Sequence, residues 1–241
     1  MKIRFMALAL VAGAAVSSAN AQTLLSYWNF NDSTPGVAGS LGILNAGGFN
    51  SNAGVFAGTL TLGGGLVANS NATTSNGAVG TFAGAVLSAL PADVANNPGG
   101  ALSIRGNASG SGTNISSNGG FIVFNLSSLG YNTLNLKFDG RGTGTGFSNN
   151  KIETSTDGVT WVTQVASYSS TATTFSTFNY ALTAAADNAS SLKVRITFNG
   201  ATSGAGNNRI DNFQISGTAI PTPGSLALLG LGGLVAGRRR R

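Results

Sequence analysis

The chain contains no cysteine and no histidine, and charged residues make up only 8% of its 241 positions. Without these two side chains, a thiol nucleophile, a Ser-His-Asp triad and a His-ligated zinc site are all excluded. The folded part must also be stable without disulfide bonds. Any acid–base chemistry would have to come from a pair of carboxylates that the fold assembles.

The excess of positive charge belongs to the two ends of the chain. Lys2, Arg4 and Arg238 to Arg241 are six of the 13 basic residues, so the segment between them carries seven basic and seven acidic residues. Nucleic-acid-binding proteins place a basic patch or stripe on their folded part. The sequence therefore predicts no nucleic-acid partner.

The first 21 residues have the pattern of a secretory signal peptide. Lys2 and Arg4 form a positively charged start, Phe5–Val16 is apolar, and Ala19-Asn20-Ala21 is an A-x-A cleavage site. We expect this segment to form the signal helix and signal peptidase to cleave it. Gln22 is then the first residue of the mature protein.

The last residues form a short apolar segment that ends in four arginines. Pro221 and Pro223 separate it from the preceding chain, because proline does not continue a helix backwards. Residues 224–237 contain no charge, and as a helix they would span roughly 21 Å, less than the ~30 Å hydrocarbon core of a bilayer. The cytoplasmic side suits the terminal arginines, which are Arg238, Arg239, Arg240 and Arg241. The pattern predicts a temporary membrane anchor, with a permanent anchor as the alternative.

This order of motifs over residues 219–241 resembles the PEP-CTERM sorting signal of Gram-negative bacteria. That signal combines a Pro-Glu-Pro motif, a short apolar stretch and a terminal arginine cluster; here Thr222 stands in place of the glutamate, between Pro221 and Pro223. The resemblance implies recognition by an exosortase, transit through the inner membrane, and release or attachment at the cell surface.

The segment between the two ends, residues 22–218, is predicted to be one β-rich domain. Leu192, Val194, Ile196 and Phe198 alternate with polar residues, which is typical of a half-buried antiparallel strand. Clusters of Gly, Asn and Ser separate the segments of this kind. The predicted strands are Leu24–Phe30, Val55–Leu62, Val79–Leu87, Ala101–Arg105, Phe121–Leu126, Thr133–Asp139, Lys151–Thr156, Thr160–Ser167, Thr174–Ala181, Leu192–Phe198 and Arg209–Ser216.

We therefore expect an all-β fold, a two-sheet antiparallel jelly-roll-like sandwich, flanked by the N-terminal signal helix and a short C-terminal apolar helix. Inside the domain, only Ala83–Val94 and Ala181–Ser190 offer a short helix. The glycine-rich segment Gly140–Gly146 is predicted to be a loop after a strand, because it lacks the lysine and following helix of a phosphate-binding loop.

The sharpest internal motif is Ser155-Thr156-Asp157-Gly158-Val159-Thr160-Trp161. Asp157-Gly158 lies between two predicted strands and favours a tight hairpin, after which the Trp161 ring can pack on the core. The motif is similar to the S-x-D-G-x-x-W hairpin of discoidin-like and other carbohydrate-binding jelly-roll domains. A structural hairpin is the first interpretation. The alternative is that Trp161, together with Tyr168 or Tyr180, contacts a sugar.

A metal site is predicted where the first and last strands meet. In jelly-roll binding domains these strands lie side by side, and their carboxylates and amides hold a structural calcium ion. By this resemblance Asn31, Asp32 and Asp211 would supply oxygen ligands, which calcium prefers. The alternative is that Asp32 serves the following turn and Asp211 pairs with Arg209 or Arg195.

These features predict a non-catalytic exported protein of the cell surface or extracellular matrix, associated with biofilm exopolysaccharide and sorted by an exosortase. The alternative is a carbohydrate-binding module. A glycosidase is the third hypothesis, and Glu153 and Asp157 would be the carboxylates closest in sequence.

Overall fold

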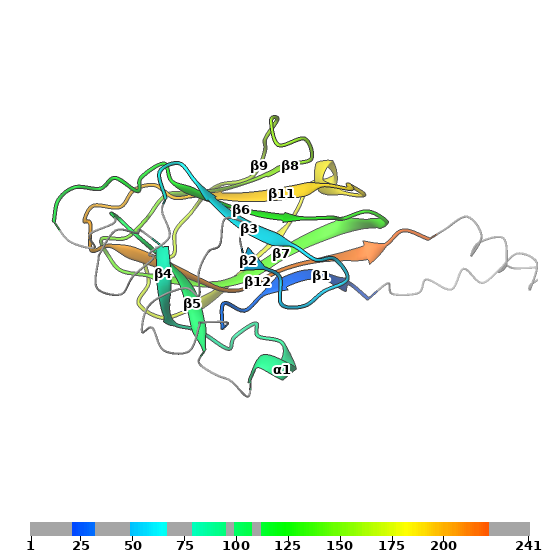
Figure 1. Cartoon of the computed structure of the whole chain (residues 1–241), viewed down its shortest axis with the longest axis horizontal. Coiled ribbons are helices and arrows are strands. Elements are labelled where there is room, and N and C mark those ends of the chain that lie inside the picture. The colour runs from blue at the N-terminus through cyan, green and yellow to red at the C-terminus, as the bar shows by residue number, and fades with distance from the viewer. Residues whose placement is uncertain (1–20, 32–48, 67–78, 95–98, 108–111, 222–241) are drawn as a thin grey trace, which may run out of the picture.

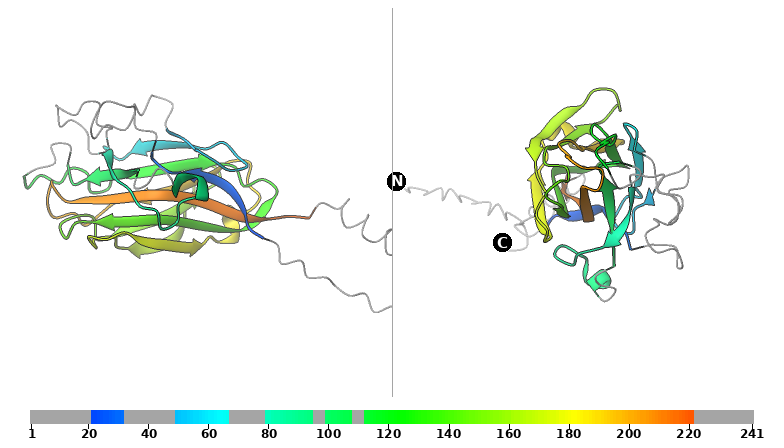
Figure 2. Two further views of the ribbon diagram at one scale, coloured as in Figure 1. Left: turned by 90° about the horizontal axis from the view of Figure 1, so that it is seen from below. Right: turned by 90° about the vertical axis from the view of Figure 1, so that its left-hand side faces the viewer.

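The computed structural model describes residues 21–31, 49–66, 79–94, 99–107 and 112–221, which form two antiparallel six-stranded sheets packed face to face (Figure 1, Figure 2). The expected all-β sandwich is therefore confirmed. Among the described residues, helix is limited to α1 (Pro91–Val94) and a 3-10 turn, η1 (Ala184–Ala186). No helix in this part of the chain is long and apolar enough to cross a bilayer.

The first sheet, here called sheet A, contains the last strand of the domain near its centre. Its order is β10 (Ser176–Ala181), β7 (Tyr131–Gly142), β12 (Asn207–Ala219), β5 (Gly100–Arg105) and β4 (Val79–Ala83), with β1 (Thr23–Trp28) also paired to β12. Sheet B has the order β2 (Phe49–Asn50), β3 (Thr59–Gly63), β6 (Phe121–Leu126), β11 (Leu192–Thr197), β8 (Asn150–Ser155) and β9 (Val162–Tyr168).

The alternation in the sequence decides which side chains enter the core. In β11, Leu192, Val194 and Ile196 are buried, whereas Lys193, Arg195 and Thr197 are half-buried on the other side. Successive side chains of a strand point to opposite faces, so the first set faces sheet A and the second forms the outer face of sheet B.

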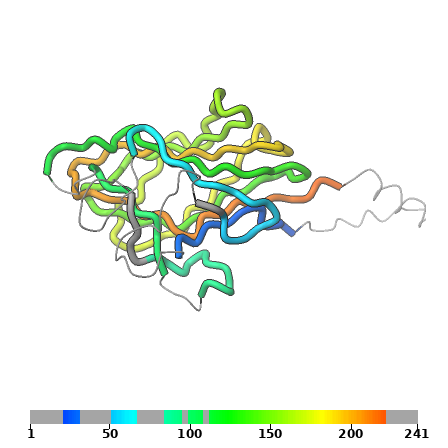
Figure 3. Tube along the Cα trace, viewed as in Figure 1, coloured from blue at the N-terminus to red at the C-terminus, as the bar shows by residue number. Residues whose placement is uncertain are grey.

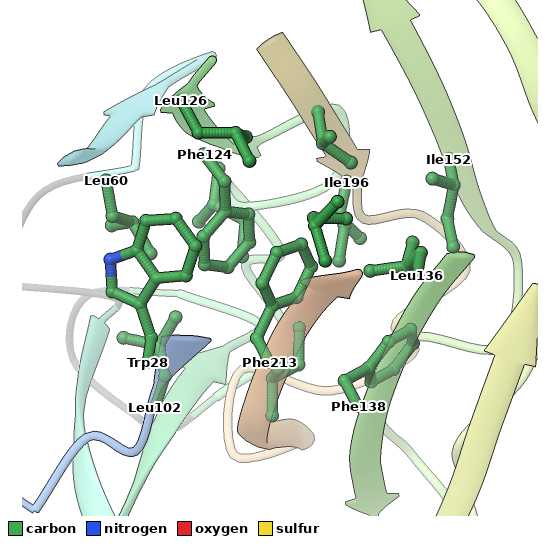
Figure 4. Close-up of a cluster of buried hydrophobic side chains, with 14 of the residues drawn as sticks. Trp28, Leu60, Leu102, Phe124, Leu126, Leu136, Phe138, Ile152, Ile196 and Phe213 are labelled. Carbon is green, nitrogen blue, oxygen red and sulfur yellow. The ribbon is translucent and has the colours of Figure 1, made fainter. Parts of the chain in front are cut away.

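Aromatic rings from both sheets meet at the centre of the core (Figure 4). Phe124 of sheet B stacks on Phe213 of sheet A with ring centroids 3.5 Å apart, and the Trp28 ring meets both of them edge-on at 5.0 Å and 5.6 Å. Rings of this size bury large apolar areas, and their contacts add about 0.5–1.5 kcal/mol each. This contact joins the two sheets.

Strand β12 contains a bulge at Asn212. Its register against β7 shifts between Asp211 and Gln214, and Asn212 has a φ of 50°. Asparagine adopts this left-handed conformation more readily than most residues. The bulge leaves Phe213 in the core while Asn212 turns its side chain toward the outer side of sheet A, where it hydrogen-bonds Tyr27, Asp139 and Ala85.

Strand β1 begins, and strand β12 ends, at the same end of the sandwich (Figure 3). The two strands are antiparallel, and Thr23 pairs with Gly217. The expected neighbourhood of the first and last strands is thus confirmed. It also follows that the predicted signal cleavage site and the predicted sorting motif both lie next to this end.

Several sequence-based boundaries differ from the structure. Strand β7 continues through Gly140 to Gly142, so the prediction of a loop from Gly140 is wrong; the backbone of these glycines pairs with β10 and β12. The helix expected over Ala83–Val94 is reduced to α1, and that over Ala181–Ser190 to η1.

The two expected terminal helices lie outside the described residues, so both stay predictions. The same holds for most of the residues expected to direct processing, because the described part of the chain begins at position 21 and ends at Pro221. The processing residues beyond these limits are Ala19, Thr222, Pro223, Arg238, Arg239, Arg240 and Arg241.

Candidate functional site

The hairpin between β8 and β9 is built around one aspartate. Asp157 Oδ1 accepts hydrogen bonds from the backbone N–H groups of Val159 and Thr160, at 2.8 Å and 2.7 Å, and from the Ser155 hydroxyl at 2.9 Å. These donors hold the pKa of Asp157 well below its usual range. Gly158 occupies the position with positive φ, +79°, which favours glycine. The connection is therefore a fixed turn that presents Trp161 in one orientation.

The Trp161 ring does not pack on the core, contrary to the expectation from the sequence. It lies on the outer face of sheet B, half-buried, where the Arg195 guanidinium carbon is 3.8 Å from the ring centroid. The same guanidinium lies 5.4 Å from the centroid of the Phe121 ring. Cation–π contacts of this kind orient both the cation and the ring.

Glu153 holds Arg195 in place, and Lys151 in turn pairs with Glu153. Arg195 Nη2 and Nε donate to Glu153 Oε2 at 2.7 Å and 3.1 Å, and Lys151 Nζ lies 2.9 Å from Glu153 Oε1. Glu153 and Arg195 face each other across neighbouring strands, so the strand register creates the pair. We call Trp161, Phe121, Arg195, Glu153 and Lys151 the sheet B platform.

The charges of the platform also govern the ionisation of Glu153. Burial of this carboxylate raises its pKa, but the hydrogen bonds and positive charges of Lys151 and Arg195 outweigh that effect and lower the pKa below its ordinary value. The pKa of Asp157 is lowered as well. A glycosidase needs one carboxyl group with a raised pKa to act as general acid. Glu153 and Asp157 do not form such a pair.

The other two aromatic residues predicted to contact sugar differ from Trp161. Tyr168 is only 7% exposed, and its ring packs against Phe138 at 5.7 Å between centroids. Its prediction as a stacking surface is therefore wrong. Tyr180 is half-buried and lies beside Tyr168, with ring centroids 6.3 Å apart. Of the three rings, Trp161 is the one held on an outer face of a sheet by charged partners.

The residues predicted to bind calcium are engaged separately. Asn31 Oδ1 accepts a hydrogen bond from the Gly100 N–H at 2.6 Å, and the Asp211 oxygens accept from Ala85 N at 2.6 Å and Asn212 N at 2.8 Å. Asp32 lies outside the described residues, and the described part of the chain holds no group of three acidic residues suited to a metal. Calcium binding therefore stays a prediction, which thermal unfolding unaffected by a chelator would exclude.

Of the two alternative ion pairs expected for Asp211, the one with Arg195 is wrong because Arg195 pairs with Glu153, and the one with Arg209 stays a prediction. Instead, Asp211 faces Asp139 on the neighbouring strand, and both carboxylates are buried under residues 84–94, which we call the strap. Ser88 donates from its backbone N–H to Asp139 Oδ2 at 2.9 Å, and the Gln214 side chain donates to Ser88 O at 2.9 Å. Two acidic residues thus fasten the strap to the outer side of sheet A.

Burial strongly affects the pKa of Asp211. It raises the pKa of Asp211 to about 8, and the negative charges of Asp139 and Asp93 act in the same direction, against the hydrogen bonds from Ala85 and Asn212. The sequence did not predict this arrangement. The alternation in β7 places Asp139 opposite the core, but no local pattern indicates that a distant segment covers it.

No protein-family model and no curated protein sequence matches the chain. Solved structures with a similar fold include the CBM22-1 xylan-binding domain of Paenibacillus barcinonensis Xyn10C, with 13% identity, a TM-score of 0.45, and coverage of 85% of this chain and 100% of that chain. The K2 cleaved adhesin domain of Lys-gingipain gives 10% identity, a TM-score of 0.42, and coverage of 81% and 97%.

A third similar structure is a family 16 carbohydrate-binding module, with 10% identity, a TM-score of 0.33, and coverage of 57% of this chain and 84% of that chain. At identities of 10% to 13% and TM-scores of 0.33 to 0.45, these likenesses leave the function of the chain to be inferred from its own residues.

Proposed function

We propose that the protein is a non-catalytic, exported carbohydrate-binding protein of the cell surface or extracellular matrix, and that the sheet B platform contacts polysaccharide. The observation that carries this proposal is the Trp161 ring, which is half-buried on an outer face and stacked against Arg195. A large apolar ring that stays at the surface and is braced by an ion pair loses little conformational freedom when a ligand binds.

The chemistry of the platform suits a sugar. The aromatic ring offers an apolar surface for the C–H faces of a pyranose or furanose. Lys151 lies on the same outer face of sheet B and offers a donor for sugar hydroxyls, whereas Glu153 is buried and holds the charged side chains in place. Lys151 remains 41% exposed, so its ammonium group is accessible to such a ligand. Binding sites of this type combine an aromatic surface with a few fixed polar groups.

The route to the cell surface is part of the same proposal. The domain begins with β1 at Thr23, directly after the predicted cleavage site before Gln22, and ends with β12 at Ala219, just before Pro221. Removal of both predicted processing segments would therefore leave the sandwich intact. We infer that signal peptidase and an exosortase process the chain, and that exopolysaccharide is its partner in a Gram-negative envelope or biofilm.

The test compares Trp161→Ala with Val159→Ala in gels that contain soluble polysaccharides. Val159 lies in the same hairpin and is exposed, so its truncation is a matched control. We expect at least one polysaccharide to retard the wild type and V159A, and W161A to bind about tenfold more weakly, as expected for loss of a central aromatic contact.

The result that contradicts the proposal is equal retardation of W161A and wild type, or no retardation of the wild type by any polysaccharide. Circular dichroism of both variants verifies the fold, which W161A is expected to keep because the ring lies outside the core.

A further inference from the structure

Strand β10 forms an open edge of sheet A. It pairs with β7 on one side only, and four of its six residues are exposed. Its register against β7 continues from Ser176 to Ala181 without a shift. A regular edge strand presents its outward backbone groups in a row, and such a row is able to pair with another strand.

The residues whose backbone faces outward follow from one hydrogen bond at the end of the strand. The Leu182 N–H donates to Leu134 O at 2.9 Å, so these opposite residues form a hydrogen-bonded pair. In an antiparallel ladder such pairs alternate with pairs whose backbone groups point away from each other. Thr177, Asn179 and Ala181 therefore point their N–H and C=O groups away from β7. Within the described part of the chain, these groups have no hydrogen-bond partner.

This edge lacks the features that usually prevent strand addition. Natural sheets block their edges with charged residues, prolines, bulges or very short strands. In sheet B, β2 has two residues and β9 shifts its register twice against β8. Strand β10 contains no proline, no charged residue and no register shift. Neither the core nor the sheet B platform explains why this edge is left open.

The open edge is complementary to itself. When a second β10 lies antiparallel beside the first, Asn179 faces Asn179 of the second copy and Thr177 faces Ala181, so each outward N–H meets an outward C=O. This arrangement makes about six hydrogen bonds. The charged residues of β7 opposite this strand are Lys137 and the buried Asp139. Their counterparts in the second copy would lie at least three strand spacings away, about 14 Å, which exceeds the Debye length of about 8 Å.

We propose that β10 pairs with β10 of a second copy of this chain, so that two copies of sheet A join into one continuous sheet. The partner is another copy because the row of donors and acceptors matches its own reverse, and no charge on the strand opposes the approach. One strand pair is a small contact, so we expect a weak association that gains strength where many copies are held close together. The pairing does not depend on carbohydrate binding at the sheet B platform.

The symmetry of this pair limits where it can form. A two-fold axis through the Asn179 pair reverses the second copy, so the ends at which the two chains leave their sandwiches point in opposite directions. Neighbouring copies anchored on one flat surface stand the same way up and do not meet this requirement. The pair therefore joins copies that are held on facing surfaces or released into a matrix, a consequence that rests on the proposed attachment at the C-terminal end.

The test uses the absence of cysteine from the chain, because a single introduced cysteine can form a disulfide bond only with a second copy. Opposite residues of a hydrogen-bonded pair have Cα atoms about 5.5 Å apart, a distance that a disulfide bond spans. We expect full-length Asn179→Cys to form dimers in the presence of dissolved oxygen at least about tenfold faster than Asn135→Cys. Asn135 is a matched control because it lies one strand inward, and both variants lose the same Asn135–Asn179 hydrogen bond.

The register of the pair provides a second check. Thr177→Cys and Ala181→Cys should each dimerise slowly alone, since equivalent residues would be about 13 Å apart along the strands, and rapidly when mixed. Adding Trp161→Ala to N179C should leave its rate unchanged, which separates this inference from the proposed carbohydrate site. The proposal is overturned if N179C dimerises no faster than N135C. It is also overturned if all single-cysteine variants dimerise at one rate, as association through the apolar tail would produce.

Discussion

At the scale of single residues, Arg195 determines the character of the sheet B surface. Its guanidinium contacts two rings and pairs with Glu153, so one side chain orients Trp161 and neutralises a buried carboxylate. The planar, delocalised guanidinium stacks on the rings while two of its N–H groups donate to Glu153 Oε2, a combination that an ammonium group cannot make. Lysine at this position would therefore keep the charge but lose the geometry.

Asp211 gives the protein a pH dependence that runs against the usual direction. Its pKa is raised in the fold from 3.8 to about 8, so folding favours the protonated carboxyl. The stabilisation is complete below the ordinary pKa and is lost as the pH rises through about 8. We expect the midpoint of thermal unfolding to fall between about pH 4 and about pH 8, and Asp211→Asn to flatten this fall.

The control for this prediction is Asp157→Asn. The pKa of Asp157 is lowered in the fold, so its contribution is lost as the pH falls, and removing it cannot flatten a decline on the alkaline side. Differential scanning calorimetry across the pH range measures all three proteins. Parallel curves for wild type and D211N would contradict the assignment.

At the scale of elements, the bulge in β12 joins the strap to sheet A. Asn212 Nδ2 donates to Asp139 Oδ2 and to Ala85 O, both at 2.9 Å, and Asn212 Oδ1 accepts from the Tyr27 hydroxyl at 2.6 Å. One residue thus connects strands β1, β7 and β12 with the strap. A bulge that re-aims a side chain in this way is a built feature of a sheet.

Two substitutions separate the backbone role of Asn212 from its side-chain role. Asn212→Gly keeps the positive φ without strain but removes the three hydrogen bonds, and we expect a loss of about 3 kcal/mol in unfolding free energy. Asn212→Ala must also adopt the left-handed conformation, and should cost about 1 kcal/mol more.

Urea denaturation measures the unfolding free energies, and hydrogen exchange at Ala85 and Ser88 reports on the strap. Both variants should exchange faster there, since they lose the contacts that hold the strap. Equal stability of the glycine and alanine variants would argue against strain at this position.

Strands formed by local sequence patterns could be predicted, whereas contacts between residues far apart in the sequence could not. Strand β6 occupies the predicted Phe121–Leu126, and β11 ends one residue before the predicted Phe198, because local alternation and burial decide both strands. The contact between Trp161 and Arg195 depends on the register between β8 and β11, and the burial of Asp139 depends on residues 84–94 crossing a distant strand. Such contacts leave no local pattern in the sequence.

At the scale of the whole molecule, the proposed processing makes a prediction about mass. Protein recovered from culture fractions should begin at Gln22 and end near Pro221–Pro223, because the two predicted cleavage sites lie just outside β1 and β12. Intact-mass spectrometry of the secreted and membrane fractions measures this. A chain that retains Arg238–Arg241 in the membrane fraction would contradict processing at the variant motif and would indicate a permanent anchor.

The position of β12 has a mechanical consequence for a protein held at its C-terminal end. This strand is paired along one side with β7 and along the other with β5 and β1, and the chain leaves the domain directly after it. A pull on the C-terminus therefore acts along a central strand and loads two ladders of hydrogen bonds in shear, instead of peeling an edge strand one bond at a time. In a domain attached in this way, both ladders of hydrogen bonds must break together before drag from a flowing or swelling matrix can pull β12 out.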